Sequence, residues 1–303
     1  MSFETPITRE GDTITGPLRA PAQMLAEQEY GGHTSVHDDA TAARLGLAGA
    51  PIEGPTHFSQ IDPLAVETWG PSWFERGCVS SHFLNMVVEG EQVRATLEPV
   101  TATLARIGAT KEDGTPVLAG TASIGRDDTT ELDVRRRRGE EEPGQLYIVD
   151  QLEIGMRDAV PEPVTMDFGS DNGSLYPFTL AQKLERITER SSWYVPGGTS
   201  PWGRPIVPTE MISVIAHRSG AHFPVRGPAV GLFIDLEVRF VDGPVFVGQP
   251  YRVDHTVVGI GQTTRVESYW TETTLTDDET GSCAATVLLH QGVFKASYAD
   301  YPA

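Results

Sequence analysis

Apolar residues recur at three- and four-residue spacing in three stretches of the chain, which predicts helices. The first predicted helix covers Gly54–Trp69, and Pro63 is expected to bend or restart it because proline lacks the N–H that a helix interior uses. The second half carries the same spacing over Tyr176–Arg190 and Thr209–His217. The side chains that set the spacing in the first helix are Phe58, Ile61, Leu64, Ala65 and Trp69.

After the helical stretches the pattern changes to alternating and β-branched positions, which predicts strands. In the first half these strands are expected at Cys78–Glu89, Gln92–Ile107 and Val117–Ile124. In the second half they are expected at Gly231–Val241, at Tyr251–Ile260 running on through Arg265–Leu275, and at Cys283–Lys295. The order of a helix followed by strands therefore occurs twice.

A highly charged stretch separates the two halves. It includes four consecutive arginines, residues 135–138, followed by a run of glutamates. Because such blocks do not pack into a core, they predict an exposed linker over 131–145 between an N-terminal domain (1–130) and a C-terminal domain (146–303). The alternative is that the arginines capture an anion such as a cofactor phosphate.

The two halves also share residues just before a helix. Gly49-Ala50-Pro51-Ile52-Glu53-Gly54-Pro55-Thr56 aligns with Gly203-Arg204-Pro205-Ile206-Val207-Pro208-Thr209. An internal repeat of about 150 residues is typical of two fused, similar domains. With a helix and an antiparallel sheet in each half, the predicted class is α+β.

Charge and composition narrow the function. The 303 residues carry a net charge of −19, which argues against binding to nucleic acid or to anionic membranes. The two cysteines, Cys78 and Cys283, are too few and too far apart for a disulfide framework or a metal motif. The first residues lack a signal-peptide pattern and no apolar run is long enough to span a membrane, so we expect a cytoplasmic protein.

A polar cluster lies before the first predicted helix. His33, His37, Asp38 and Asp39 precede a Gly/Pro-rich break that leads to Gly54. Histidine has an unperturbed pKa of about 6.5, which suits proton transfer at neutral pH. Free N–H groups at a helix start stabilise developing negative charge. The cluster therefore predicts a catalytic site, although either aspartate can instead cap a short helix over residues 40–45.

These features resemble the MaoC-type enoyl-CoA hydratases and dehydratases, which have a double hotdog fold. The resemblance implies two fused hotdog domains, each a long central helix wrapped by an antiparallel sheet. The family motif reads Asp-x-Asn-Pro-x-His-x-Asp, followed by Ala, Gly and Pro-Ile-x-x-Gly. His37 and Asp39 fall on its His and second Asp, and residues 51–54 fall on its helix start. The first Asp, the Asn and the Pro are replaced by Gly32, Thr34 and Ser35.

The resemblance implies a lyase that adds water to, or removes it from, a 2-enoyl or 3-hydroxyacyl thioester. His37 would be the acid/base and the Gly54 amide would polarise the thioester carbonyl, while His33 or Asp39 would stand in for the carboxylate that Gly32 lacks. The resemblance assigns the N-terminal half the catalytic residues and the C-terminal half a widened pocket. Expected substrate contacts are Thr34, Asp38, His57 and Trp202, with Trp193 and Tyr194 as further pocket or interface aromatics.

No cofactor is expected beyond the CoA of a thioester substrate, and no metal. A site made of His33, His37 and Asp39 would need that stretch to be helical, and the glycines before it disfavour a helix. The expected partners are a small acyl substrate and a second copy in a homodimer of double hotdogs. Two other functions stay open: a different proton-transfer, elimination or cyclisation reaction on a non-CoA substrate, and an inactive hotdog that acts as a binding or scaffold protein.

Overall fold

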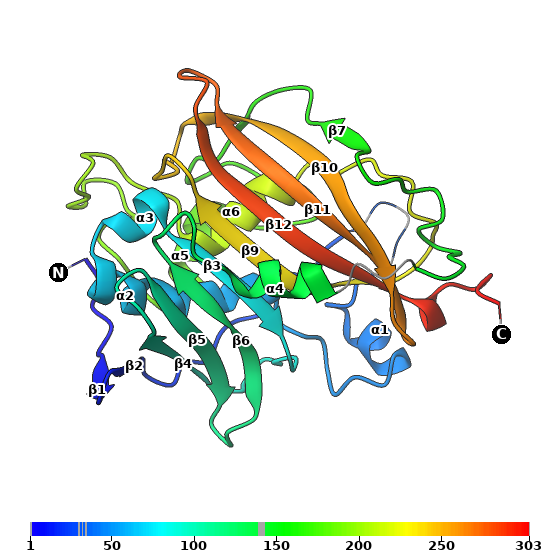
Figure 1. The fold of residues 1–303 in the computed structure, drawn as a ribbon, viewed down its shortest axis with the longest axis horizontal. Coiled ribbons are helices and arrows are strands. Elements are labelled where there is room, and N and C mark those ends of the chain that lie inside the picture. Colours follow the sequence, from blue (N-terminus) through cyan, green and yellow to red (C-terminus); the bar gives the residue numbers. More distant parts are fainter. Residues whose placement is uncertain (1, 30, 32, 34, 139–142, 303) are drawn as a thin grey trace.

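The computed structural model describes residues 2–29, 31, 33, 35–138 and 143–302. Its strands form one twelve-stranded sheet, and every pair in it is antiparallel (Figure 1). The N-terminal strands are β1 (Thr8–Glu10), β2 (Thr13–Thr15), β3 (Cys78–Phe83), β4 (Val93–Pro99), β5 (Leu104–Lys111) and β6 (Pro116–Ser123). The C-terminal strands are β7 (Arg157–Ala159), β8 (Val164–Thr165), β9 (Gly231–Phe240), β10 (Pro250–Gln262), β11 (Val266–Asp277) and β12 (Cys283–Phe294).

The strand order repeats between the halves. In the N-terminal half the order across the sheet is β4-β5-β6-β3, and in the C-terminal half it is β10-β11-β12-β9. The two series join where β3 pairs with β9, from Cys78 opposite Arg239 to His82 opposite Asp235. The internal repeat predicted from the sequence is therefore present as a repeated topology within one continuous sheet.

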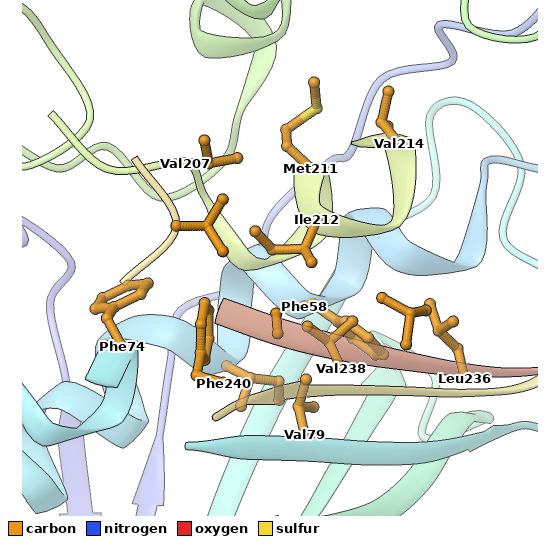
Figure 2. Packing of buried hydrophobic residues seen from close by; sticks show 14 of the residues in the cluster. Phe58, Phe74, Val79, Val207, Met211, Ile212, Val214, Leu236, Val238 and Phe240 are labelled. Carbon is orange, nitrogen blue, oxygen red and sulfur yellow. The ribbon is translucent and has the colours of Figure 1, made fainter. Parts of the chain in front are cut away.

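Each half also has a helix that packs on its strands. A 3-10 turn, η1 (Gly54–His57), leads into α2 (Phe58–Trp69), which packs against β4. In the second half α6 (Thr209–His217) packs against β9, β11 and β12 and also contacts α2. Figure 2 shows Met211 and Ile212 of α6 in one packed layer with Phe58 of α2 and Val238 of β9. Apolar residues of both halves thus form a shared core.

The first predicted helix is confirmed, but Pro63 does not restart it. Pro63 lies inside α2, which runs unbroken from Phe58 to Trp69. Proline at this position removes one N–H donor, a loss that the packing of the helix tolerates. The segment from Phe58 to Ala65 is buried, so tertiary burial holds the helix together around the proline.

Two predicted long strands are instead hairpins. The segment predicted as 92–107 turns between β4 and β5, where Thr101 Oγ1 accepts a hydrogen bond from Leu104 N at 3.0 Å. The segment predicted as one strand across 251–275 turns between β10 and β11, where Thr263 Oγ1 accepts from Val266 N at 3.3 Å. Threonine hydroxyls stabilise both turns, and threonine also favours strands, so the pattern concealed them.

The helix predicted at Tyr176–Arg190 is also shorter than expected. It is α5 (Leu180–Arg186), and its start is fixed by a capping box in which Thr179 and Gln182 bond reciprocally. The backbone before it turns instead, with Phe178 N donating to Tyr176 O at 2.7 Å. The remaining short elements are α1 (Asp39–Arg44), α3 (Ser72–Arg76) and η2 (Lys295–Ser297). Among the described residues, no helix has the length and apolar character needed to cross a membrane.

The exposed linker expected over 131–145 is wrong for its first eight residues. They form α4 (Glu131–Arg138), which packs across β3 and β9 where the two halves join. Leu132 is fully buried, and its N–H donates to Ser80 Oγ at 3.0 Å. Arg135 pairs with Glu131 at 2.8 Å, so this arginine is held by a carboxylate of the chain rather than left for an anion. One buried leucine explains why so polar a segment is docked.

We expect Leu132→Ala to lower the free energy of unfolding by about 2–5 kcal/mol, because it leaves a cavity beneath α4. Chemical denaturation measures the change, with the partly exposed neighbour Val134→Ala as the control. A change below about 0.5 kcal/mol, the range of an ordinary surface substitution, would show that α4 is not docked.

Candidate active site

A cavity of about 630 Å³ lies between the two halves. The N-terminal half contributes the segment around His37, the helix start and the end of β3. The C-terminal half contributes the end of α6 and inward-facing residues of β9–β12. The side chains and glycine used in the argument below are His33, His37, Glu53, Gly54, His57 and His217. Both halves therefore build the site that the sequence assigned mainly to the first.

His37 is held in one orientation at the cavity wall. Its Nδ1 lies 2.6 Å from Pro51 O, and because a carbonyl oxygen only accepts, Nδ1 carries the hydrogen. In the neutral ring this leaves Nε2 as the basic nitrogen, with no hydrogen-bond partner among the described residues. Burial lowers the pKa of His37, against the opposing effects of the Pro51 hydrogen bond and the Glu53 charge. His37 is thus a neutral base near pH 7.

The carbonyl that holds His37 is itself fixed. Pro51 bridges to Val88, and the adjacent Ile52 N donates to Val87 O at 2.7 Å. Gln23 Nε2 donates to Pro51 O at 2.6 Å, so the oxygen accepts from two donors. The repeated Pro-Ile segment before the helix therefore orients the histidine as well as starting the helix.

His33 also reaches the cavity. Its ring packs against Gly227, where an added Cβ would lie only 2.6 Å from His33 Cε1. The glycine is therefore required for the ring to approach the backbone so closely. Thr34, predicted to bind substrate, and Gly32, at the family's aspartate position, lie outside the described residues.

Asp38 and Asp39 do not reach the cavity and serve local structure instead. Asp38 caps α1, where its Oδ1 accepts from Thr41 N at 2.8 Å; this bond lowers the pKa of the exposed carboxyl. Asp39 Oδ1 accepts from Ala50 N at 3.1 Å, and its side chain is exposed. The expected catalytic role of Asp39 and the expected substrate contact of Asp38 are not supported by this placement. Both follow from cap and turn chemistry.

Gly54 forms part of the cavity wall at the start of η1. An added Cβ at this position would lie 2.7–3.0 Å from atoms of the Phe83 ring, so a side chain there would displace Phe83. The first N–H groups of a helix have no intrahelical partner and are suited to a polarised oxygen. Gly54 keeps this helix start accessible while Phe83 closes the wall beside it.

A buried ionic network borders the cavity, and sequence reasoning missed it. Lys183 Nζ donates to Glu53 Oε1 at 2.6 Å and to Thr56 Oγ1 at 3.0 Å, and lies 3.1 Å from Glu210 Oε2. Burial raises the pKa of Glu210 to about 7, although Lys183 opposes the shift. Glu53 was within the quoted Pro-Ile-Glu-Gly motif but was read only as part of a helix start. The network joins the first half to α5 and α6 of the second.

Three further histidines line the cavity with a ring nitrogen that lacks a partner and solvent: His57 Nδ1, His217 Nε2 and His255 Nε2. Burial lowers the pKa of His57 to about 4 and that of His217 to about 3. The rings of His217 and His255 stack with centroids 6.4 Å apart. Of these, only His57 was predicted as a site residue; His217 appeared as a helix end and His255 lay in a strand.

Trp202 is not a pocket residue. Its Nε1 donates to Glu75 Oε1 at 3.1 Å, and its ring packs edge-on against Phe74 and Trp193. Tyr194 donates to Asp62 Oδ2 at 2.9 Å and is also absent from the described cavity lining. These aromatics belong to the core and its margin, so the expected substrate contact of Trp202 is not supported. Aromatic type alone does not separate a pocket from a core.

Other polar groups lie elsewhere. His82 and His290 both contact the carboxylate of Asp235, at 2.7 and 2.6 Å, outside the cavity lining. Within the described part of the chain, no three His, Cys, Asp or Glu side chains are arranged to hold a metal ion. Cys78 and Cys283 are both unpaired.

Comparison with solved structures agrees with this architecture. A protein described as a MaoC domain dehydratase from Chloroflexus aurantiacus matches with a TM-score of 0.55 at 15% identity, covering 95% of each chain. A MaoC-like dehydratase matches with a TM-score of 0.50 at 12% identity, covering 95% of this chain and 99% of the other. The chain has the double hotdog fold. No family model matches the sequence, and no curated protein does.

The double hotdog also predicts a stability difference at low pH that traces to His57. Its pKa is about 4 in the folded protein and about 6.5 in an unfolded chain. Between these values the unfolded chain binds the proton and the folded one does not, so stability falls as the pH decreases. We expect this to cost about 2 kcal/mol between pH 7.5 and 5, and His57→Gln to lose that much less than the wild type.

Denaturation at the two pH values measures the difference, with His222→Gln as the control because the His222 side chain is 82% exposed. The raised pKa values of Asp62 and Glu210 act in the opposite direction, but both groups are present in every variant and cancel. An identical pH dependence in His57→Gln and the wild type would contradict the buried, neutral His57.

Proposed function

We propose that the protein is an acyl-thioester hydratase or dehydratase in which His37 transfers the proton. The observation that carries the proposal is the anchored ring of His37, whose Nδ1 is bound to Pro51 O while Nε2 stays unpartnered at the cavity wall. A fixed, neutral imidazole of this kind is suited to general base catalysis. The double hotdog fold, shared with proteins described as MaoC-type dehydratases, supports the same reaction class.

In this proposal the reaction takes place on C2 and C3 of the acyl group. In the elimination direction Nε2 of His37 removes the C2 proton, and the electron pair of that bond forms the new double bond as hydroxide leaves C3. The Gly54 N–H, at the start of η1, would receive the thioester carbonyl as negative charge builds on its oxygen. No cofactor is needed beyond the carrier that the substrate brings.

The cavity fits an acyl chain better than a highly charged ligand. Its described lining includes apolar side chains from both halves, such as Val117, Phe233 and Leu289. A volume of about 630 Å³ lies in the usual range for a small-molecule pocket. These features support an acyl substrate of moderate length.

A second candidate is a related elimination or proton transfer on a substrate without CoA. Among the described residues that line the cavity, Arg218 is the one lysine or arginine. The phosphates of CoA usually require several cationic contacts, and the chain carries a net charge of −19. The same base would then act on an acyl group with a different carrier.

We expect His37→Gln to reduce hydration of trans-2-enoyl-CoA thioesters by about 10²–10⁴-fold, because it removes the base. Loss of the conjugated-thioester absorbance measures the rate across a series of chain lengths. His222→Gln, at the exposed position used above, is the matched control and should retain the wild-type rate.

A folded His37→Gln protein with the wild-type rate would remove His37 from the mechanism. A wild-type protein that is inactive on every chain length would reject the CoA thioester as substrate and favour the second candidate. Circular dichroism verifies folding of each variant, since loss of the Pro51 contact alone is expected to change stability modestly.

A further inference from the structure

Elimination of water needs a proton donor as well as a base. His37 accepts the C2 proton, but hydroxide is a poor leaving group and requires a proton at the C3 oxygen. With Nδ1 bound to Pro51 O, the ring has one nitrogen available for reaction, so a second group must act as the acid. The further inference therefore rests on the proposed function and asks which group this is.

The charges and contacts around the cavity single out Glu53. Glu53 lines the cavity, and its charge raises the pKa of both His37 and His57 against their burial. Its Oε1 accepts from Lys183 and from Thr56, while no described residue donates to Oε2. Glu53 therefore has one oxygen fixed by the protein and one left for a bound molecule.

The other carboxylates are less suited to this role. Asp38 and Asp39 are held by α1 and by Ala50 N and do not reach the described cavity lining. Glu29 lines the cavity, but its side chain is exposed, so solvent screens its charge. Glu210 is almost completely buried behind Lys183 and is also outside the lining.

The network behind Glu53 can supply the proton. It contains two carboxyl groups and one ammonium, all of them at most 7% exposed. Burial raises the pKa of Glu210 to about 7, so this carboxyl holds a proton for much of the time near neutral pH. Neither Glu210 oxygen accepts a well-aligned hydrogen bond, although Lys183 Nζ lies 3.1 Å away. One transferable proton thus lies a single lysine away from Glu53.

We propose that Glu53 is the catalytic acid opposite His37, and that Lys183 and Glu210 recharge it. In the elimination, His37 Nε2 takes the C2 proton and the C3–O bond breaks as Glu53 protonates the leaving oxygen, which releases water. Glu53 regains its proton from Lys183, and Lys183 regains one from Glu210. The proton on His37 returns to the network through water in the emptied cavity, so the charges balance over a turnover. Hydration follows the reverse path.

The first test compares Glu53→Gln with Glu112→Gln, which makes the same charge change at an exposed turn. With the trans-2-enoyl-CoA assay, Glu53→Gln should lower kcat by about 10²–10⁴-fold with little effect on KM, because the amide still fills the site but cannot transfer a proton. Glu112→Gln should match the wild type. A wild-type kcat in folded Glu53→Gln would overturn the assignment.

The second test does not depend on activity. Titration of labelled His37 by NMR reports its pKa in the wild type and in each variant. Removing the Glu53 charge should lower the pKa of His37, since that charge raises it, whereas Glu112→Gln should leave it unchanged. An unchanged pKa in Glu53→Gln would show that the two groups do not face each other, and would overturn the proposal even if the protein has no hydratase activity. A lowered pKa in a protein inactive on all thioesters would support the pair and reject only the CoA substrate.

Glu53→Asp provides the conservative rescue and a second route if Glu53→Gln does not fold. It retains a carboxyl group that is one methylene shorter, so we expect a folded protein with part of the lost kcat restored. Loss of kcat as severe as that of Glu53→Gln, with the pKa of His37 equal to the wild-type value, would indicate a purely structural role and contradict the proposal.

Discussion

The site depends on a buried ionic network where the two hotdog halves meet. Lys183 comes from the second half and is held between Glu53 of the first half and Glu210 of α6. Desolvating three ionisable groups is costly, and a buried ion pair of this kind is weak evidence for stability. An apolar core would hold the halves together at lower cost, as the packing of α2 on α6 already does. The position of the network at the cavity edge gives it a chemical explanation instead.

The repeated topology allows the two halves to differ in chemistry. Both present a helix start to the centre of the molecule, but the first has Glu53 and Gly54 where the second has Val207 and Pro208. Only the first helix start lines the cavity with a carboxylate and a free backbone N–H. The second half contributes Lys183, Glu210 and two buried histidines, so it tunes and encloses the site. One sheet joined at β3 and β9 keeps these contributions in register.

The sequence was sufficient for the fold and for one side of the site. The recurrence of Pro-Ile before each helix predicted two hotdog halves, and the family motif located His37 and Gly54 at what is the cavity wall. Turns built by Thr101 and Thr263 escaped detection because threonine also favours strands. Pairings across 130 residues, such as Glu53 with Lys183, leave no mark in local pattern. Asp39 was misassigned because a turn cap and a catalytic carboxylate look alike in sequence.

The most direct test of the account is a crystal structure of the protein with a bound 3-hydroxyacyl thioester that reacts slowly. The account predicts that C2 lies against His37 Nε2 and that the C3 hydroxyl lies within about 3 Å of Glu53 Oε2, with the acyl chain in the cavity between the halves. An acyl group bound with its C2 and C3 away from both side chains, or bound outside this cavity, would contradict the shared His37–Glu53 site.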